Sequence, residues 1–291
     1  MAGKRTPSVR GRQLAAQLRR LREAATLTGD EVAARIGWSP SKVSRIETAQ
    51  SEITSGDLRK LLALYEVSGS QRDRLLELGR NAQQRGWWDA YGDTLRPEAA
   101  TFLALEADAE SVRWFAPVVL PGLLQTEQYA RHVINSHMLI APPARVERLV
   151  QVRLTSQDVL SRKRPLDVAI VLDEAVLRRP VGGPQVLAGQ LRHLLELAGQ
   201  PNFSIQVLPF TVGSHPGTSG GFTILRFPEL LAADVVYLEN MTSDLFVESE
   251  ADVYRYSLAF DQLCNLALGE DESKAFIAEA AGLGDEIVTE E

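Results

Sequence analysis

The chain has 291 residues, of which 45 % are hydrophobic and 24 % charged, and its formal net charge is −7. This length suits two domains with ordinary hydrophobic cores. No apolar run approaches the roughly 18 residues that suggest a membrane span, the basic start lacks the apolar stretch of a secretory signal, and the single cysteine excludes an intramolecular disulfide and a cysteine-rich metal site. We therefore expect a cytoplasmic protein with no membrane partner.

The charge is divided unevenly along the chain. Residues 1–85 contain 16 Lys and Arg against 9 Asp and Glu, whereas residues 86–291 contain 15 Lys and Arg against 29 Asp and Glu. A small basic segment joined to a larger acidic one is typical of a DNA-reading domain on an acidic body. Acidic domains are also common in the cytoplasm, so charge alone leaves an ordinary solvated surface as the alternative.

The N-terminal part is predicted to be all-α. Residues 1–10 are basic and lack periodicity, which predicts a flexible arm. Beyond the arm, the hydrophobic period predicts helices at about 11–25, 29–36, 40–48, 55–66 and 70–84. We therefore expect a five-helix bundle over residues 11–85.

The second and third of these helices have the pattern of a helix-turn-helix. Gly37 suits a helix end with positive φ, and Ser39 can cap the next helix, with Pro40 at its first position. Val43 and Ile46 form an inward-facing apolar pair. The opposite face carries Ser41, Ser44, Arg45 and Thr48. A helix of this kind is typical of one that lies in a major groove.

The polar side chains of this motif are given separate roles. We predict base contacts from Ser41, Ser44 and Arg45, because a guanidinium pairs bidentately with guanine O6 and N7. The alternative for Arg45 is a solvated surface arginine. Contacts to the DNA backbone are predicted for Thr28, Ser39, Lys42, Thr48, Arg5, Arg10 and Arg12. Structural support is predicted from Arg22, Ala33, Gly37, Val43, Ile46 and Glu47, with Glu47 pairing Arg22.

The motif resembles the XRE (Cro/CI-like) family of helix-turn-helix regulators. The resemblance rests on Ala33, Gly37 and the run Ser-Lys-Val-Ser-Arg-Ile-Glu at 41–47. Two positions depart from the family. Pro40 stands where a Gln often heads the recognition helix, and Gly29 stands where a phosphate-contacting Gln often opens the first helix. Readout is therefore expected to depend on the serines and arginine of 41–45.

The remainder of the chain is predicted to mix helices and strands. Residues 86–97 contain Trp87 and Trp88, which we expect to dock the head onto the body or, alternatively, to share in a dimer contact. Residues 98–284 are expected to be an α+β domain with a small mixed sheet, and residues 285–291 a frayed acidic tail. Helices are predicted at 98–113, 124–136, 143–162, 184–199, 250–268 and 273–282. Strands are predicted at 166–172, 203–208, 222–227, 235–238 and 245–247.

The order of these elements predicts one crossover into a parallel pair of strands, followed by an antiparallel meander. These elements offer few residues that indicate catalysis. Asp173 and Glu174 close a strand, where we expect them to cap the following helix. The loop 213–221 matches neither a P-loop nor GxGxxG, and is either a long turn or a loop that contacts a ligand or partner. Its residues of interest are Gly213, His215, Gly217, Gly220 and Gly221.

No metal, cofactor or enzymatic activity is expected. The four histidines lack metal-ligand spacing, and Cys264 falls on an amphipathic helix, where a small buried hydrophobe is the default. An enzyme with a DNA-binding head stays an alternative if Asp173, Glu174 and His215 line one pocket.

Several segments of the body also resemble a known group. They are PGLLQTEQYAR (121–131), VLDEAVLRRPVGG (171–183), QLRHLLELA (190–198), QVLPFTVGSHPGTSGGF (206–222) and VVYLEN (235–240). They are similar to the C-terminal domain of a large actinobacterial regulator group, in which an XRE head precedes a domain of unknown function. Many members are encoded beside a small partner protein and some are antitoxin-like. The stretch after Arg148 departs from the group.

Together these features predict a sequence-specific, nucleoid-associated transcription regulator. We expect it to bind double-stranded DNA as a homodimer on an inverted repeat. Its C-terminal domain is expected to hold the dimer and to respond to a partner protein or small ligand. The alternative is an antitoxin-like protein that mainly sequesters a small partner protein and binds DNA for autoregulation.

Overall fold

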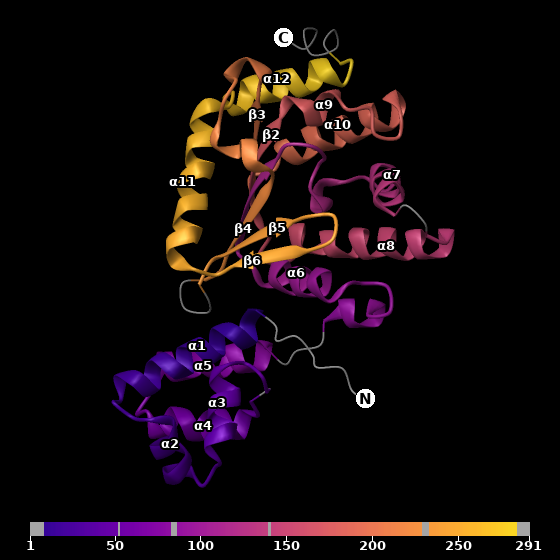
Figure 1. Ribbon diagram of the computed structural model, residues 1–291. Coiled ribbons are helices and arrows are strands. Elements are labelled where there is room, and N and C mark those ends of the chain that lie inside the picture. The colour runs from indigo at the N-terminus through magenta and orange to yellow at the C-terminus, as the bar shows by residue number, and fades with distance from the viewer. Residues whose placement is uncertain (1–8, 52, 83–85, 139–140, 229–232, 284–291) are drawn as a thin grey trace. The chain divides into compact units, whose positions relative to one another are not determined.

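The structure is a computed structural model that describes residues 9–51, 53–82, 86–138, 141–228 and 233–283 (Figure 1). The chain divides into two compact units. The first comprises Met1–Asp89 with Phe227–Ala233, and the second comprises Ala90–Arg226 with Asp234–Glu291. None of the described helices is long and apolar enough to cross a membrane.

Five α-helices form the N-terminal region. They are α1 (Val9–Ala24), α2 (Gly29–Ile36), α3 (Pro40–Glu47), α4 (Ser55–Leu64) and α5 (Gly69–Asn81). One hydrophobic core joins them, in which Leu18, Val32 and Leu62 are fully buried. Threonines cap α2 and α4 by accepting a backbone N–H three residues further on. The predicted all-α head is confirmed.

Six strands in the second unit form one mixed sheet with the order β3-β2-β1-β4-β5-β6. The strands are β1 (Ser111–Ala116), β2 (Asp167–Asp173), β3 (Phe203–Leu208), β4 (Phe222–Arg226), β5 (Val235–Glu239) and β6 (Asp244–Val247). β1 and β3 run parallel to β2, whereas β1, β4, β5 and β6 pair antiparallel in turn. The expected α+β domain, with its parallel pair and its meander, is confirmed.

The central strand of this sheet lies where the sequence predicts a helix. The prediction of a helix over residues 98–113 is wrong at its end, because the helix ends at Asp108 and residues 111–116 form β1. Val112 and Trp114 point to one face of β1 and Phe115 to the other, and all three are buried. Polar and apolar residues alternate only from Ser111 to Trp114, because Phe115 and Ala116 are both apolar and buried. Four alternating residues directly after a helix are too few to mark a strand by periodicity.

Helices cover both faces of the sheet (Figure 1). The α-helices are α6 (Pro97–Asp108), α7 (Glu127–His137), α8 (Pro143–Ser156), α9 (Glu174–Arg178), α10 (Pro184–Ala198), α11 (Glu250–Leu266) and α12 (Glu270–Ala280). On one face, α11 packs Phe260 and Leu263 against Phe115 and Ile224. On the other, Phe102 of α6 stacks on Tyr237 of β5, with ring centroids 4.3 Å apart.

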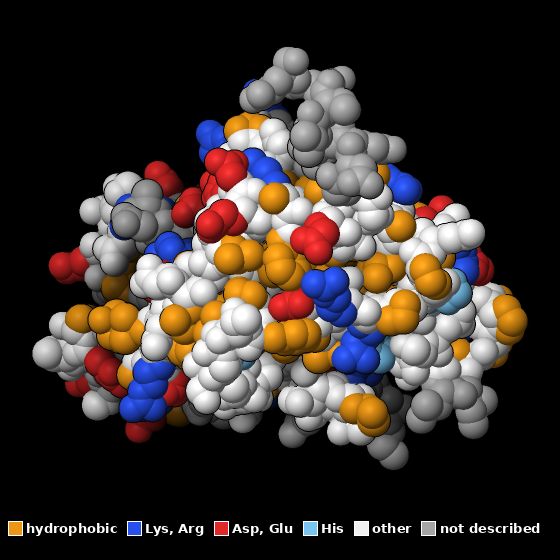
Figure 2. Space-filling view, turned by 90° about the horizontal axis from the view of Figure 1, so that it is seen from above, with side chains coloured by type: hydrophobic (Ala, Val, Ile, Leu, Met, Phe, Trp, Pro, Cys, Tyr) orange, Lys and Arg blue, Asp and Glu red, His pale blue; other side chains and the backbone are white. Residues whose placement is uncertain are grey.

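Short 3₁₀ helices complete the described chain. They are η1 (Trp87–Tyr91), η2 (Gly122–Leu124), η3 (Gln157–Leu160), η4 (Phe210–Val212) and η5 (Pro216–Ser219). Trp87 and Trp88 in η1 are half-buried and meet edge to face, with ring centroids 5.8 Å apart. Figure 2 shows a face on which basic and acidic side chains are mixed with hydrophobic ones, without a continuous basic band.

Candidate DNA interface

Local chemistry sets the start and end of α2. The Thr28 hydroxyl accepts the backbone N–H of Glu31, and a Glu31 carboxylate oxygen accepts the Thr28 N–H at 2.7 Å, which completes a capping box. At the other end, Gly37 adopts φ 71° and its N–H bonds to the carbonyl of Ala33. A side chain would strain this left-handed residue. The chain therefore turns within Gly37–Ser39 and enters α3.

Helix α3 is anchored from behind by its apolar face. Ser39 caps it by accepting the N–H of Lys42 at 3.3 Å, and Pro40 occupies its first position. Val43 and Ile46 are 2 % and 4 % exposed and belong to the core of the head. Burying two branched side chains contributes roughly 1.5–3 kcal/mol each. The helix is thus fixed in rotation about its own axis.

The opposite face of α3 is open. Ser41, Ser44, Arg45 and Thr48 are all exposed, and their spacing brings them onto one surface. Two of the hydroxyls have local partners. Thr48 donates to the carbonyl of Ser44 at 2.7 Å, and the hydroxyls of Ser39 and Ser41 lie 3.1 Å apart. The guanidinium of Arg45 is therefore the strongest outward donor group on this face.

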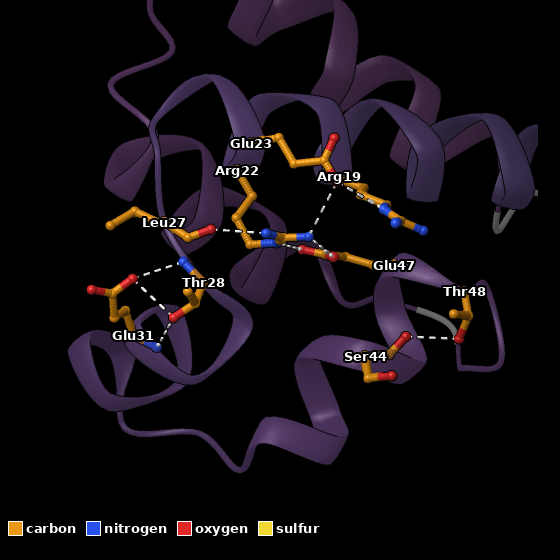
Figure 3. Close-up of polar contacts among 9 residues, drawn as sticks. All are labelled: Arg19, Arg22, Glu23, Leu27, Thr28, Glu31, Ser44, Glu47 and Thr48. Carbon is orange, nitrogen blue, oxygen red and sulfur yellow. Dashed lines mark hydrogen bonds and ion pairs between the residues drawn. The ribbon is translucent and has the colours of Figure 1, made fainter.

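An ion pair ties α3 to α1 (Figure 3). Arg22 donates to both carboxylate oxygens of Glu47, at 2.8 and 3.0 Å, and to the carbonyl of Leu27 at 2.8 Å. The Arg22 and Glu47 side chains are only 15 % and 9 % exposed. The hydrogen bond to Glu47 raises the pKa of Arg22. The pairing of Arg22 with Glu47 that the sequence predicts is present.

Lys42 has a partner that the sequence analysis did not identify. Its ammonium donates to a carboxylate oxygen of Asp57 in α4 at 2.8 Å and lies 4.0 Å from the centre of the Trp38 ring. The hydrogen bond from Lys42 lowers the pKa of Asp57. A lysine held by a carboxylate is a weaker phosphate ligand than an unpaired one.

A surface hollow of about 480 Å³ lies between α1, α2 and α3. Its lining comprises Arg19, Arg22, Gly29, Asp30, Pro40, Ser41, Val43, Ser44, Glu47 and Thr48. Arg19 was missed by the sequence analysis, although it stands three residues before Arg22 and so shares its face of α1. Its exposed side chain, which bonds to Glu23 at 3.0 Å, lines the same hollow as three hydroxyl-bearing residues, Ser41, Ser44 and Thr48. Arginine and hydroxyls together suit a backbone phosphate.

The three arginines assigned to the arm have different positions. Arg5 lies outside the described residues. Arg10 falls in the first turn of α1 and is only 7 % exposed, and burial lowers the pKa of its guanidinium to about 10. This burial contradicts a backbone contact from a flexible arm at Arg10. Arg12 is half-buried in the same helix.

The body residues considered for chemistry are engaged in local structure. Asp173 accepts the N–H of Ala175 and so caps α9, and Glu174 bonds to Arg178 and to the N–H of Phe210. His215 accepts the N–H of Gly217. Among the residues that the structure describes, no group of three or more His, Cys, Asp or Glu is placed to hold a metal ion.

Two of the glycines in loop 213–221 lie too close to neighbouring atoms to carry a side chain. A Cβ at Gly217 would lie 2.2 Å from the Phe115 ring, and one at Gly221 would lie 3.0 Å from the Phe115 carbonyl oxygen. Gly213 and Gly220 adopt φ 69° and 128°. Close contact with β1 therefore accounts for two of these glycines without a ligand.

Comparison with known proteins supports both halves of this description. Residues 13–75 match a helix-turn-helix domain, and residues 99–279, more than half of the chain, match the family described as Domain of unknown function (DUF5753). The chain belongs to the DUF5753 family. No curated protein and no solved structure matches it. The helix-turn-helix match indicates a DNA-binding regulator. The predicted resemblance of the body to a domain of unknown function is confirmed, and that domain is DUF5753.

Proposed function

We propose that the protein is a sequence-specific transcription regulator of the XRE type that reads DNA with α3. The observation that supports it most is the two-sided character of this helix. Val43 and Ile46 are buried, and Glu47 is held by Arg22. The exposed face carries Ser41, Ser44 and Arg45. A rigidly held helix with one polar face fits a major groove, where Arg45 can recognise guanine.

Backbone contacts then come from the edges of the same face. Arg19 and Thr48 line the hollow between α1 and α3, and Thr28 caps the start of α2. Phosphate contacts at these positions would fix the register of α3 without carrying sequence information. Lys42 contributes less than an unpaired lysine, since Asp57 competes with the phosphate for its ammonium.

A single head buries too little surface for high specificity, and so we propose a homodimer on an inverted repeat. The two copies of α3 would enter successive major grooves about 34 Å apart. The acidic body repels DNA and is therefore better suited to holding the dimer together than to binding DNA. We place the dimer in the cytoplasm, on the nucleoid. It would also receive a signal from a partner protein or small ligand, which shifts how well the two heads fit their half-sites.

We infer a binding function for the body and no catalysis. Asp173, Glu174 and His215 are the carboxylates and imidazole that the sequence offers for chemistry. Each makes a hydrogen bond that serves local structure, at the start of α9, at Phe210 and at Gly217.

Selection from a random duplex library with the full-length protein tests this function. The proposal predicts recovery of an inverted repeat whose half-site centres are separated by about one helical turn, 10–10.5 base pairs, or a multiple of it. Light scattering of the complex would then give two chains per duplex. Recovery of no common sequence, or of a single half-site bound by one chain, would contradict the proposal.

A further inference from the structure

The two edge strands of the sheet, β3 and β6, differ in what covers their outer backbone groups (Figure 1). At β3, the Val207 N–H donates to the Ser273 hydroxyl and the Val207 carbonyl accepts the Leu268 N–H, each at 2.9 Å. The start of α12 and the residues before it therefore close that edge. At β6, no group outside the sheet bonds to the backbone of residues 244–247 among the residues that the structure describes. An open edge of this kind is a template for pairing with another chain.

The hairpin between β5 and β6 determines which groups of β6 point outward. The Asn240 N–H bonds to the Ser243 carbonyl at 3.0 Å, so these two residues form a hydrogen-bonded pair. Hydrogen-bonded and non-hydrogen-bonded pairs alternate along an antiparallel ladder. In the register of β5 with β6, Asp244 and Phe246 therefore turn their N–H and C=O groups away from β5. These outward groups, two positions apart, have the spacing that a further antiparallel strand requires.

The side chains of β6 do little to protect this edge. Natural edge strands are commonly blocked by a lysine, a proline or a bulge. Residues 244–247 contain neither lysine nor proline, and their register with β5 is continuous. Leu245 is 54 % exposed, and Phe246 and Val247 are half-buried. The short strand is thus open and largely apolar.

We propose that β6 pairs antiparallel with β6 of a second copy of this chain, about a two-fold axis at Phe246. The choice of a second copy rests on the proposed function, which requires a dimer. A two-fold interface uses the same surface on both copies, and here the outward groups of Phe246 bond to those of Phe246 in the second copy. Leu245 then lies opposite Val247 of the second copy, so apolar residues meet at three consecutive positions. A register centred on Leu245 would instead place Asp244 opposite Phe246.

Arg96 provides charge complementarity at both ends of the strand pair. It donates to the Asp244 carboxylate through Nη2 alone, at 3.2 and 3.3 Å. Its Nε and Nη1 atoms have no partner within the described part of the chain, and its side chain is 44 % exposed. The proposed register brings Glu248 of the second copy opposite Asp244. Arg96 can therefore bind both carboxylates, which would otherwise repel each other across the strands.

The length of β6 sets the expected strength of this dimer. Two strands of four residues make a small interface, so the dimer should be weak when it is free in solution. DNA that contains both half-sites should strengthen it, because each copy then contributes one bound head.

Disulfide trapping of the full-length protein tests the interface. In a Cys264→Ala background, Phe246→Cys places the thiols of two copies at one hydrogen-bonded pair, where the Cα atoms are about 5.5 Å apart and a disulfide can form. Mild oxidation should link the chains at concentrations at which light scattering shows the wild type to be dimeric. Leu245→Cys is the matched control, since it is exposed but two positions out of register with its own copy. It should link at least about tenfold more slowly.

A second variant tests the interface without a cross-link. Leu245→Lys places an ammonium opposite Val247 of the second copy and should raise the dimer dissociation constant at least about tenfold. Its circular dichroism should match that of the wild type, because Leu245 is exposed in the single chain. Leu258→Lys, at a position of α11 that is 50 % exposed, is the control and should leave the dimer intact.

Three results would overturn the interface. They are a wild type that is monomeric at all concentrations and on DNA, linkage of Phe246→Cys no faster than that of Leu245→Cys, and wild-type dimerisation of Leu245→Lys. Failure of the interface differs from failure of the proposed function. Two chains on a selected inverted repeat, with Phe246→Cys unlinked, would reject β6 as the interface and retain the regulator. A linked Phe246→Cys dimer that selects no common DNA sequence would retain the interface and reject the regulator.

Discussion

Arg22 reaches from α1 to α3 and holds both carboxylate oxygens of Glu47, at 2.8 and 3.0 Å. Since Glu47 ends the helix that carries Ser44 and Arg45, this pair sets the position of the polar face relative to the rest of the head (Figure 3). The third donor of Arg22 satisfies the carbonyl of Leu27. One side chain therefore connects the first helix, the segment before α2 and the end of α3.

Glu47→Leu alone should destabilise the head by about 3 kcal/mol, because it removes the carboxylate that accepts two hydrogen bonds from half-buried Arg22 and leaves only the more distant Glu23, at 3.6 Å. Hydrogen exchange of the α1 and α3 amides in the full-length protein measures this loss. The double variant Arg22→Met with Glu47→Leu should recover most of it, because no unpaired charge then remains. If the double variant is as unstable as the single one, the two side chains do not act as a pair.

Gly37→Ala should cost about 1 kcal/mol of local stability, because it forces a Cβ into a left-handed conformation at φ 71°. Gly56→Ala is the matched control. Gly56 lies inside α4, and the nearest atom to an added Cβ there is the Thr54 hydroxyl at 3.9 Å. That substitution should stabilise α4 by up to about 1 kcal/mol. Equal effects of the two changes on exchange protection would argue against a left-handed conformation at Gly37.

Asp57→Asn should release Lys42 for DNA and strengthen binding to every duplex tested. The slope of log K against log salt should become steeper by about 0.9, which corresponds to one additional phosphate contact. Fluorescence anisotropy over a salt series measures both quantities. Asp73→Asn removes the same charge from an exposed position of α5 and is the control. If the two variants behave alike, the gain comes from net charge and not from Lys42.

The same carboxylate predicts a dependence of stability on pH. Lys42 holds the pKa of Asp57 below its ordinary value of 3.8. Because the pKa of Asp57 is lower in the folded state than in the unfolded state, its ionised form stabilises the protein above pH 3.8. This stabilisation is lost as the pH falls from 3.8 to the folded-state pKa. Protection of the α3 and α4 amides should therefore decline less steeply in Asp57→Asn than in the wild type as the pH falls below about 4. An unchanged decline would show that Asp57 does not contribute.

The head was predictable from sequence because its signals are local. The positions of Gly37, Ser39 and Pro40 mark the turn, and the spacing of Val43 and Ile46 marks the buried face. The pairing of Lys42 with Asp57 was not predictable, because it depends on how α4 packs against α3. The role of Arg19 was not predictable for the same reason, since only the packing of α1 brings it into the hollow that Ser41 also lines.

The body shows more clearly which parts of the fold the sequence alone does not predict. Residues 111–116 follow a helix that is rich in alanine, and the change to a strand is marked by neither glycine nor proline. β1 forms because it pairs with β2 on one side and with β4 on the other. Both partners are more than fifty positions away in the sequence. Periodicity within a short window does not contain that information. The strands of the meander were found because turns separate them.

Binding of Arg45→Ala to a set of single-base-pair variants of the selected site tests the central claim most directly. We predict that it loses discrimination of about 1–3 kcal/mol at one or two base pairs and keeps the wild-type preference elsewhere, while circular dichroism stays unchanged. Arg72→Ala, at an exposed position of α5, should match the wild type. A uniform loss of affinity across all sequences would make Arg45 a phosphate contact and would contradict base reading by α3.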